Sequence, residues 1–126
     1  MTTHYRTALT AVGPDVADLL DGGILILFAD GAPPELAEVS VLHRVADGPT
    51  ADAPPVGAAI AIGTLGATLT AIGALAWAKV ADMGHVVINF DGADETSRPG
   101  EISASVVDPG DLVAAIKPGA ILTISA

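Results

Sequence analysis

An uncharged segment in the middle of the chain limits what this sequence can fold into. No charged residue occurs between Asp52 and Lys79, and positions 56–78 give 23 consecutive uncharged, largely apolar residues. This is about the length that a membrane-spanning helix requires. However, the segment contains glycines at positions 57, 63, 66 and 73 and threonines at 64, 68 and 70, which make it a poor helix former. Residues 67–71 alternate as in a strand. We therefore expect two strands dividing at Leu65-Gly66, with a membrane helix as the alternative.

Strand and turn signals occur along the rest of the chain. Apolar runs and alternating patterns predict strands over residues 5–12, 23–29, 39–45, 85–90 and 101–107, and the C-terminal end is also predicted to be β. Short helices are expected over residues 14–20 and 74–83, the second closed by a left-handed Gly84, with one helical turn at most over 35–38. We therefore predict a single, mainly β domain over residues 1–126 with two or three short helices.

The composition excludes several classes of function. Fifteen acidic and five basic residues give a net charge of -10, which disfavours nucleic acids and anionic membrane surfaces as partners. The absence of cysteine excludes disulfides, thiolate catalysis and cysteine-based metal sites. The glycine motifs of nucleotide-binding loops are missing, and the three histidines lack metal-ligand spacing, so we expect no cofactor and no metal. No secretion signal is recognisable, which favours the cytoplasm.

His43 is the strongest candidate for chemistry. Period-two alternation over residues 39–45 places it on the same strand face as Val39, Val41 and Val45. A histidine in this setting is most often a hydrogen-bonded structural residue. With a reference pKa near ~6.5, its ring is mostly neutral at cytoplasmic pH, so one nitrogen is a nucleophile that can attack phosphorus. The valines would shield a phosphorylated ring from water, and Arg44 would offset charge on the transferring group.

Several short motifs, in register along the chain, resemble the glucitol/sorbitol-specific IIA family of the sugar phosphotransferase system. Residues 28–38, FADGAPPELAE, followed by Leu42-His43, are similar to the active-site region of that family. The later motifs that match are Leu69-Thr70-Ala71-Ile72-Gly73, Gly84-His85-Val86, Phe90-Asp91-Gly92, Pro99-Gly100 and Lys117-Pro118-Gly119. The likeness runs from about Tyr5 to Ile124, and several motifs together are more specific than any one of them.

The resemblance implies a small closed β-barrel of complex topology and a phosphoryl-carrier function without independent small-molecule turnover. His43 would accept a phosphoryl group at Nε2 from the phosphohistidine of HPr, with Nδ1 held by a backbone carbonyl. It would then pass the group to a cysteine on a IIB component in a separate chain, for uptake of a sugar alcohol. Association with the membrane component IIC would be peripheral.

Other interpretations remain open at the level of residues. His85 follows a glycine at a helix–strand junction, where it would bond to local backbone or lie beside the phosphoryl group as a donor. Residues 44–46 and 76–80 depart from the family pattern, which permits a regulatory or orphan binding module without onward transfer. A third hypothesis is a hydrolytic or isomerising enzyme that uses His43 as a general base with Asp30 or Glu35.

Overall fold

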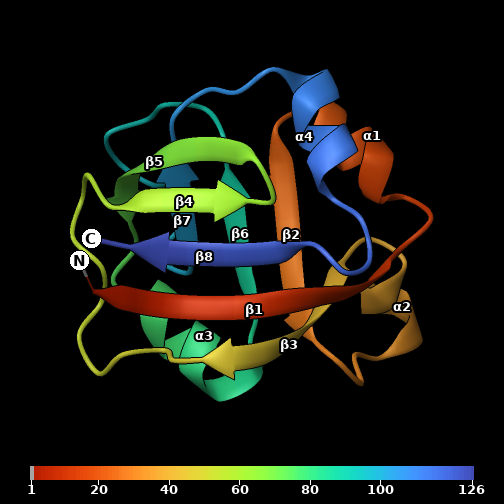
Figure 1. Cartoon of the computed structure of the whole chain (residues 1–126), viewed down its shortest axis with the longest axis horizontal. Coiled ribbons are helices and arrows are strands. Elements are labelled where there is room, and N and C mark those ends of the chain that lie inside the picture. The colour runs from red at the N-terminus through yellow and green to blue at the C-terminus, as the bar shows by residue number, and fades with distance from the viewer. Residues whose placement is uncertain (1) are drawn as a thin grey trace.

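The computed structural model describes residues 2–126, which form eight strands and four short helices (Figure 1). The strands are β1 (Thr3–Val12), β2 (Ile24–Ala29), β3 (Val41–Asp47), β4 (Ala59–Ile62), β5 (Leu65–Ile72), β6 (Val86–Asn89), β7 (Glu101–Ala104) and β8 (Ile121–Ser125). The helices are α1 (Val16–Asp21), α2 (Pro34–Ala37), α3 (Ala76–Met83) and α4 (Pro109–Ala115). The strands close into a barrel in the order β1-β3-β2-β6-β7-β5-β4-β8. The predicted closed, mainly β barrel is therefore confirmed.

The strand order is complex because two pairs of barrel neighbours are parallel. Strands β2 and β3 run parallel, as do β6 and β7, whereas the other neighbours are antiparallel. A parallel pair cannot be closed by a tight hairpin and needs a longer connection. The connection between β2 and β3 contains α2, and the register of that pair sets Ala29 beside His43.

Aliphatic side chains fill the barrel interior. Alternate residues of the strands point inward, and the completely buried ones include Leu25, Val41, Leu69, Ile88 and Ile102. Only 3% of the residues are aromatic, so branched aliphatic side chains must supply most of the packed volume. Helix α3 adds Trp77, whose Nε1 donates to the backbone oxygen of Thr50 at 2.7 Å.

The uncharged segment forms two barrel strands, as predicted, but they divide two residues earlier than the predicted Leu65-Gly66, which lies inside β5. Residues 56–78 contain β4, β5 and the start of α3, and the two strands are separated by Gly63 and Thr64. Over residues 2–126 no helix combines the length and the apolar character that crossing a bilayer demands. The alternative of one continuous membrane helix over this segment is therefore wrong.

Four short helices form where two or three were predicted, and α4 is the one that the sequence patterns missed. Pro109-Gly110 is by itself a turn signal, and the C-terminal end was predicted to be β. In the structure the Asp108 side chain caps the helix by accepting from the Asp111 backbone amide at 3.0 Å, and Pro109 occupies the start of the helix. An acidic cap followed by proline is a helix-start signal that outweighs the turn signal of Pro-Gly. The predicted left-handed cap of α3 is confirmed, since Gly84 has a φ of 60°.

Candidate functional site

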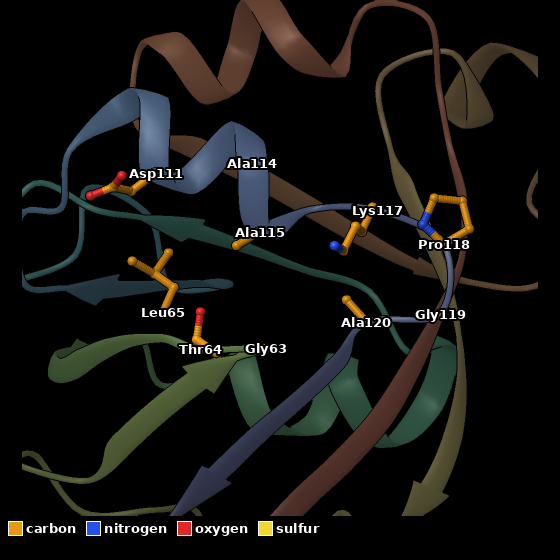
Figure 2. Close-up of a pocket in the computed structure, with 10 residues that line it drawn as sticks. All are labelled: Gly63, Thr64, Leu65, Asp111, Ala114, Ala115, Lys117, Pro118, Gly119 and Ala120. Atoms are coloured by element: carbon orange, nitrogen blue, oxygen red, sulfur yellow. The ribbon is translucent and has the colours of Figure 1, made fainter.

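Two cavities of the barrel lie away from the predicted site residues. A cavity of about 690 Å³ opens between the β4–β5 turn, α4 and the segment before β8 (Figure 2). A second cavity, of about 520 Å³, is bounded by residues 71–74 and by the loop over residues 94–99. Neither is lined by His43, Arg44 or His85. The surroundings of these three residues are therefore defined by their local contacts and not by either cavity.

His43 lies inside the barrel wall, between β1 and β2. Its neighbours across the sheet are Leu9 on β1 and Ala29 on β2. The side chain is only 1% exposed, and Val41 on the same face is fully buried. This confirms the inward face predicted for these two residues. Val45 is 39% exposed and belongs to the stretch 44–47 of β3, in which every residue is exposed, so it shields the ring less than expected.

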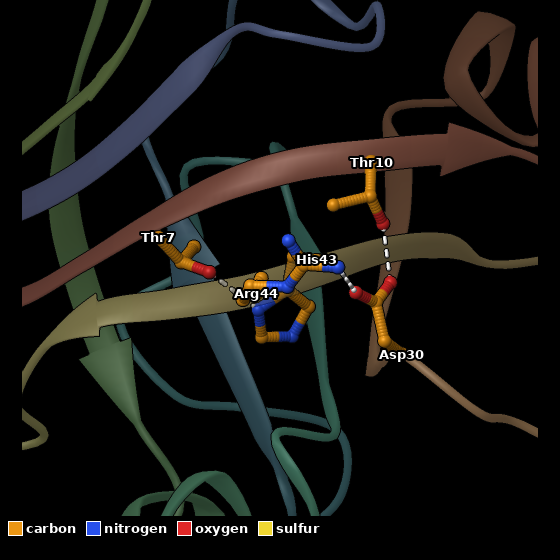
Figure 3. Close-up of polar contacts among 5 residues, drawn as sticks. All are labelled: Thr7, Thr10, Asp30, His43 and Arg44. Carbon is orange, nitrogen blue, oxygen red and sulfur yellow. Dashed lines mark hydrogen bonds and ion pairs between the residues drawn. The ribbon is translucent and has the colours of Figure 1, made fainter.

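Both ring nitrogens of His43 are hydrogen bonded. Nδ1 lies 2.7 Å from the Thr7 hydroxyl, and Nε2 lies 2.6 Å from the backbone oxygen of Gly84 (Figure 3 shows the Thr7 contact). A carbonyl can only accept, so in the neutral ring Nε2 carries the proton and the Thr7 hydroxyl donates to Nδ1. The expectation of a backbone carbonyl at Nδ1 is wrong, because the inward face of β1 presents a hydroxyl there and the end of α3 presents the carbonyl to Nε2.

Burial lowers the pKa of His43 from its ordinary value of 6.5. The hydrogen bond to the Gly84 carbonyl and the negative charge of Asp30 act in the opposite direction without reversing the shift. A charged imidazole would lose its hydration inside the barrel wall, which is the reason for the direction of the shift. The ring is therefore neutral near pH 7.

We expect the buried ring to make stability depend on pH. In the unfolded chain His43 takes up a proton near its ordinary pKa of 6.5, whereas in the folded barrel it does so only at lower pH. The unfolded state thus binds more protons as the pH falls below that value, and the free energy of unfolding decreases. Urea unfolding of the wild type and of His43→Gln, from about pH 8 to pH 5, isolates this contribution. Parallel pH curves for the two proteins would contradict it.

Arg44 points away from the His43 ring, since successive residues of a strand face opposite sides. Its Nη2 atom lies 3.2 Å from Oδ2 of Asp30, and Oδ1 of the same carboxylate accepts a hydrogen bond from the Thr10 hydroxyl (Figure 3). The Arg44 side chain is 77% exposed, so this ion pair contributes little to stability. The structure therefore does not bring Arg44 to the imidazole, and its role as a charge stabiliser stays a prediction.

His85 lies next to the His43 contact. It follows Gly84, whose carbonyl accepts from His43, and its own Nδ1 lies 3.0 Å from the backbone oxygen of Leu27. Its ring is tilted by 41° against Phe28, with 5.0 Å between the ring centroids. His85 thus bonds to backbone, as one of its two interpretations predicted, but to the neighbouring strand β2 rather than to local backbone. Gly84 therefore connects the two histidines, because its carbonyl accepts from His43 and the next residue in the chain is His85.

Sequence patterns missed the polar groups that β1 contributes. Thr7 is fully buried, and Tyr5 packs edge-on against His43 with 6.2 Å between ring centroids. The Tyr5 hydroxyl is buried without a partner among residues 2–126, and burial raises the pKa of Tyr5 to about 12. Period-two alternation could have found this contact, because it puts Tyr5, Thr7 and Leu9 on one face of the strand. The Thr7 hydroxyl then lies between two large buried side chains.

Metal binding has no support in this arrangement. Within the described part of the chain, no three histidine, aspartate or glutamate side chains are grouped as metal ligands. The site consists of a neutral imidazole with two fixed hydrogen bonds, a second histidine one residue from its carbonyl partner, and an exposed ion pair outside the wall. Such a site can supply a nitrogen nucleophile.

The barrel has the fold of a phosphotransferase-system IIA component. The crystal structure of the PTS system IIA component from Enterococcus faecalis V583 superposes with a TM-score of 0.72, covering 96% of this chain and 99% of that one at 17% identity. At this identity the likeness shows the fold alone.

Two sequence comparisons define the family more narrowly. The family model described as PTS system glucitol/sorbitol-specific IIA component matches residues 4–124. The PTS system glucitol/sorbitol-specific EIIA components of Shigella flexneri and of Escherichia coli strain K12 are each 33% identical over 122 residues, covering 97% of this chain and 94% of theirs. The chain belongs to the glucitol/sorbitol-specific IIA component family of the phosphotransferase system. It is therefore one part of a phosphotransferase with several components.

Proposed function

We propose that this chain, acting as one domain over residues 1–126, carries a phosphoryl group on His43. The donor is the phosphohistidine of HPr, and the acceptor is a cysteine of a IIB component that works with the membrane component IIC in sugar-alcohol uptake. Residues 1–126 contain no cysteine, so the acceptor is not part of this domain. The cytoplasm, where HPr and IIB would be met, is the proposed location.

The observation that supports this proposal is a buried, neutral imidazole in a family member. His43 is 1% exposed and its pKa is lowered by burial, so the ring is uncharged and able to act as a nucleophile near pH 7. In the reaction a bond forms between the His43 nitrogen and phosphorus while the donor nitrogen–phosphorus bond breaks. The electron pair of the broken bond stays on the donor imidazole, which binds a proton.

The transfer needs positioning more than covalent help from the protein, because phosphoryl transition states are loose and spread charge over the equatorial oxygens. We expect His85 to act on that charge, because it directly follows Gly84, whose carbonyl accepts from Nε2 of His43. Its Nδ1 donates to the Leu27 carbonyl, so Nε2 is the ring nitrogen left to face a phosphoryl oxygen. Arg44 would contribute only after leaving Asp30.

Phosphorylation by the complete donor chain tests the proposal. We expect purified protein incubated with phosphoenolpyruvate, enzyme I and HPr to gain one acid-labile phosphate, which intact-mass measurement detects. Peptide mapping under alkaline conditions should place it on His43, and addition of a IIB component should remove it. Absence of an adduct on His43 would refute the proposal. A stable adduct that no IIB component discharges would instead indicate the regulatory module.

A further inference from the structure

The resting hydrogen bonds of His43 present the wrong nitrogen for attack at Nε2. The Gly84 carbonyl holds a proton on Nε2, so the lone pair of the neutral ring is on Nδ1. Nδ1 faces Thr7, which is fully buried between the strands, and a phosphoryl group has no room there. Nε2 faces the end of α3, where Met83 is 41% exposed. Gly84 is itself buried, but it directly follows the exposed end of α3, so Nε2 lies on the side that opens when the Gly84 carbonyl turns away, and it lacks the lone pair.

The two partners of the ring differ in what they can do. A carbonyl oxygen only accepts a hydrogen bond, whereas a threonine hydroxyl both donates and accepts. If Nδ1 carries the proton, the Thr7 hydroxyl can accept it after rotation of its O–H bond alone, with the oxygen in place. The Gly84 carbonyl cannot adapt in this way, because it would face a lone pair on Nε2, and it has to turn away. Glycine permits that rotation better than any other residue.

We propose that Thr7 is a positioning residue for phosphoryl transfer, whose hydroxyl changes from donor to acceptor at Nδ1 of His43 and so allows Nε2 to attack phosphorus. The inference rests on the proposed function. While the Gly84 carbonyl is turned away, the His43 ring opens transiently to solvent, so that Nε2 loses its proton to water and Nδ1 gains one from water before the ring closes again on Thr7. Nε2 then bonds to phosphorus, the donor nitrogen–phosphorus bond breaks, and its electron pair stays on the donor imidazole. The Nδ1 proton remains on His43, bonded to Thr7.

Replacement of the Thr7 hydroxyl tests this role. Thr7→Val keeps the shape of the side chain but cannot accept from Nδ1, so we expect the initial rate of phosphorylation by phosphorylated HPr to fall about tenfold or more. Thr7→Ser keeps the hydroxyl and should stay within about threefold of the wild type. Thr70→Val is the matched control, because the Thr70 hydroxyl is also buried, has no partner among residues 2–126, and lies on β5. It should be phosphorylated at the wild-type rate.

A second readout separates positioning from a general loss of stability. Protonation of His43 places a charged N–H at Nδ1, which Thr7→Val leaves without an acceptor. The titration midpoint of His43, monitored through the nitrogen-15 shifts of its ring, should therefore move to lower pH in Thr7→Val. It should not move in Thr7→Ser or Thr70→Val. Phosphorylation of Thr7→Val at the wild-type rate with an unmoved titration would overturn the role of Thr7 alone. A wild-type protein that gains no phosphate would overturn the proposed function and this inference with it.

Discussion

The His43→Gln variant should gain no phosphoryl group from phosphorylated HPr, a loss of about a thousandfold or more in initial rate. Glutamine has a similar reach and offers an amide N–H to the Gly84 carbonyl and an amide oxygen to the Thr7 hydroxyl. It retains no nitrogen lone pair that can attack phosphorus. The measurement is incorporation of acid-labile phosphate over time, with thermal unfolding as a check that the barrel is intact.

Two other histidines provide the controls for that experiment. His4 bonds to the Thr50 hydroxyl at 2.7 Å near the start of β1, remote from the Gly84 contact, so His4→Gln should be phosphorylated like the wild type. His85→Gln should slow the transfer without abolishing it, because it removes a neighbour of the phosphoryl group and keeps the nucleophile. Full phosphorylation of a folded His43→Gln protein would mean that another residue is the acceptor.

The Gly84→Ala variant should be strongly destabilised and should disturb the His43 ring. Gly84 has a φ of 60°, and left-handed backbone costs a residue with a Cβ about 1–2 kcal/mol. A Cβ there would lie 3.0 Å from the Ala29 Cβ and 3.2 Å from the His43 Cε1. Overpacking of this kind adds about 1–3 kcal/mol. Urea unfolding measures the total, and nitrogen-15 shifts of the His43 ring report the altered contact to the Gly84 carbonyl.

Gly63→Ala separates backbone strain from the steric contact. Gly63 has nearly the same φ, 59°, but a Cβ there would have no neighbour within 4 Å. We therefore expect Gly63→Ala to lose only the stability that left-handed backbone costs a residue with a Cβ. The nitrogen-15 shifts of His43 should stay unchanged. Equal losses of stability in the two variants, with unchanged His43 shifts in Gly84→Ala, would show that Gly84 does not press on the imidazole.

The sequence predicted the orientation of His43 but not its long-range partners, and the difference has a physical reason. Alternation along one strand correctly placed His43 on an inward face, because the side-chain direction in a strand follows from period two. The same rule points Arg44 outward, yet the sequence analysis expected Arg44 beside the transferring group and did not reveal its pairing with Asp30. That pairing arises from the parallel register of β2 and β3, which brings the end of β2 beside β3. Thr7 was missed because its partner is 36 residues away.

Local patterns were sufficient for most strands, for the left-handed end of α3 and, through several motifs in register, for the family. These properties depend on neighbouring residues, so the order of residues along the chain carries them. The hydrogen bonds of His43 depend instead on β1 and on the end of α3, which only the closed barrel brings to the two sides of one imidazole. Which nitrogen carries the proton follows from partners distant in sequence. Folding therefore settled the protonation of the His43 ring, whereas the sequence had already singled out His43 as the candidate nucleophile.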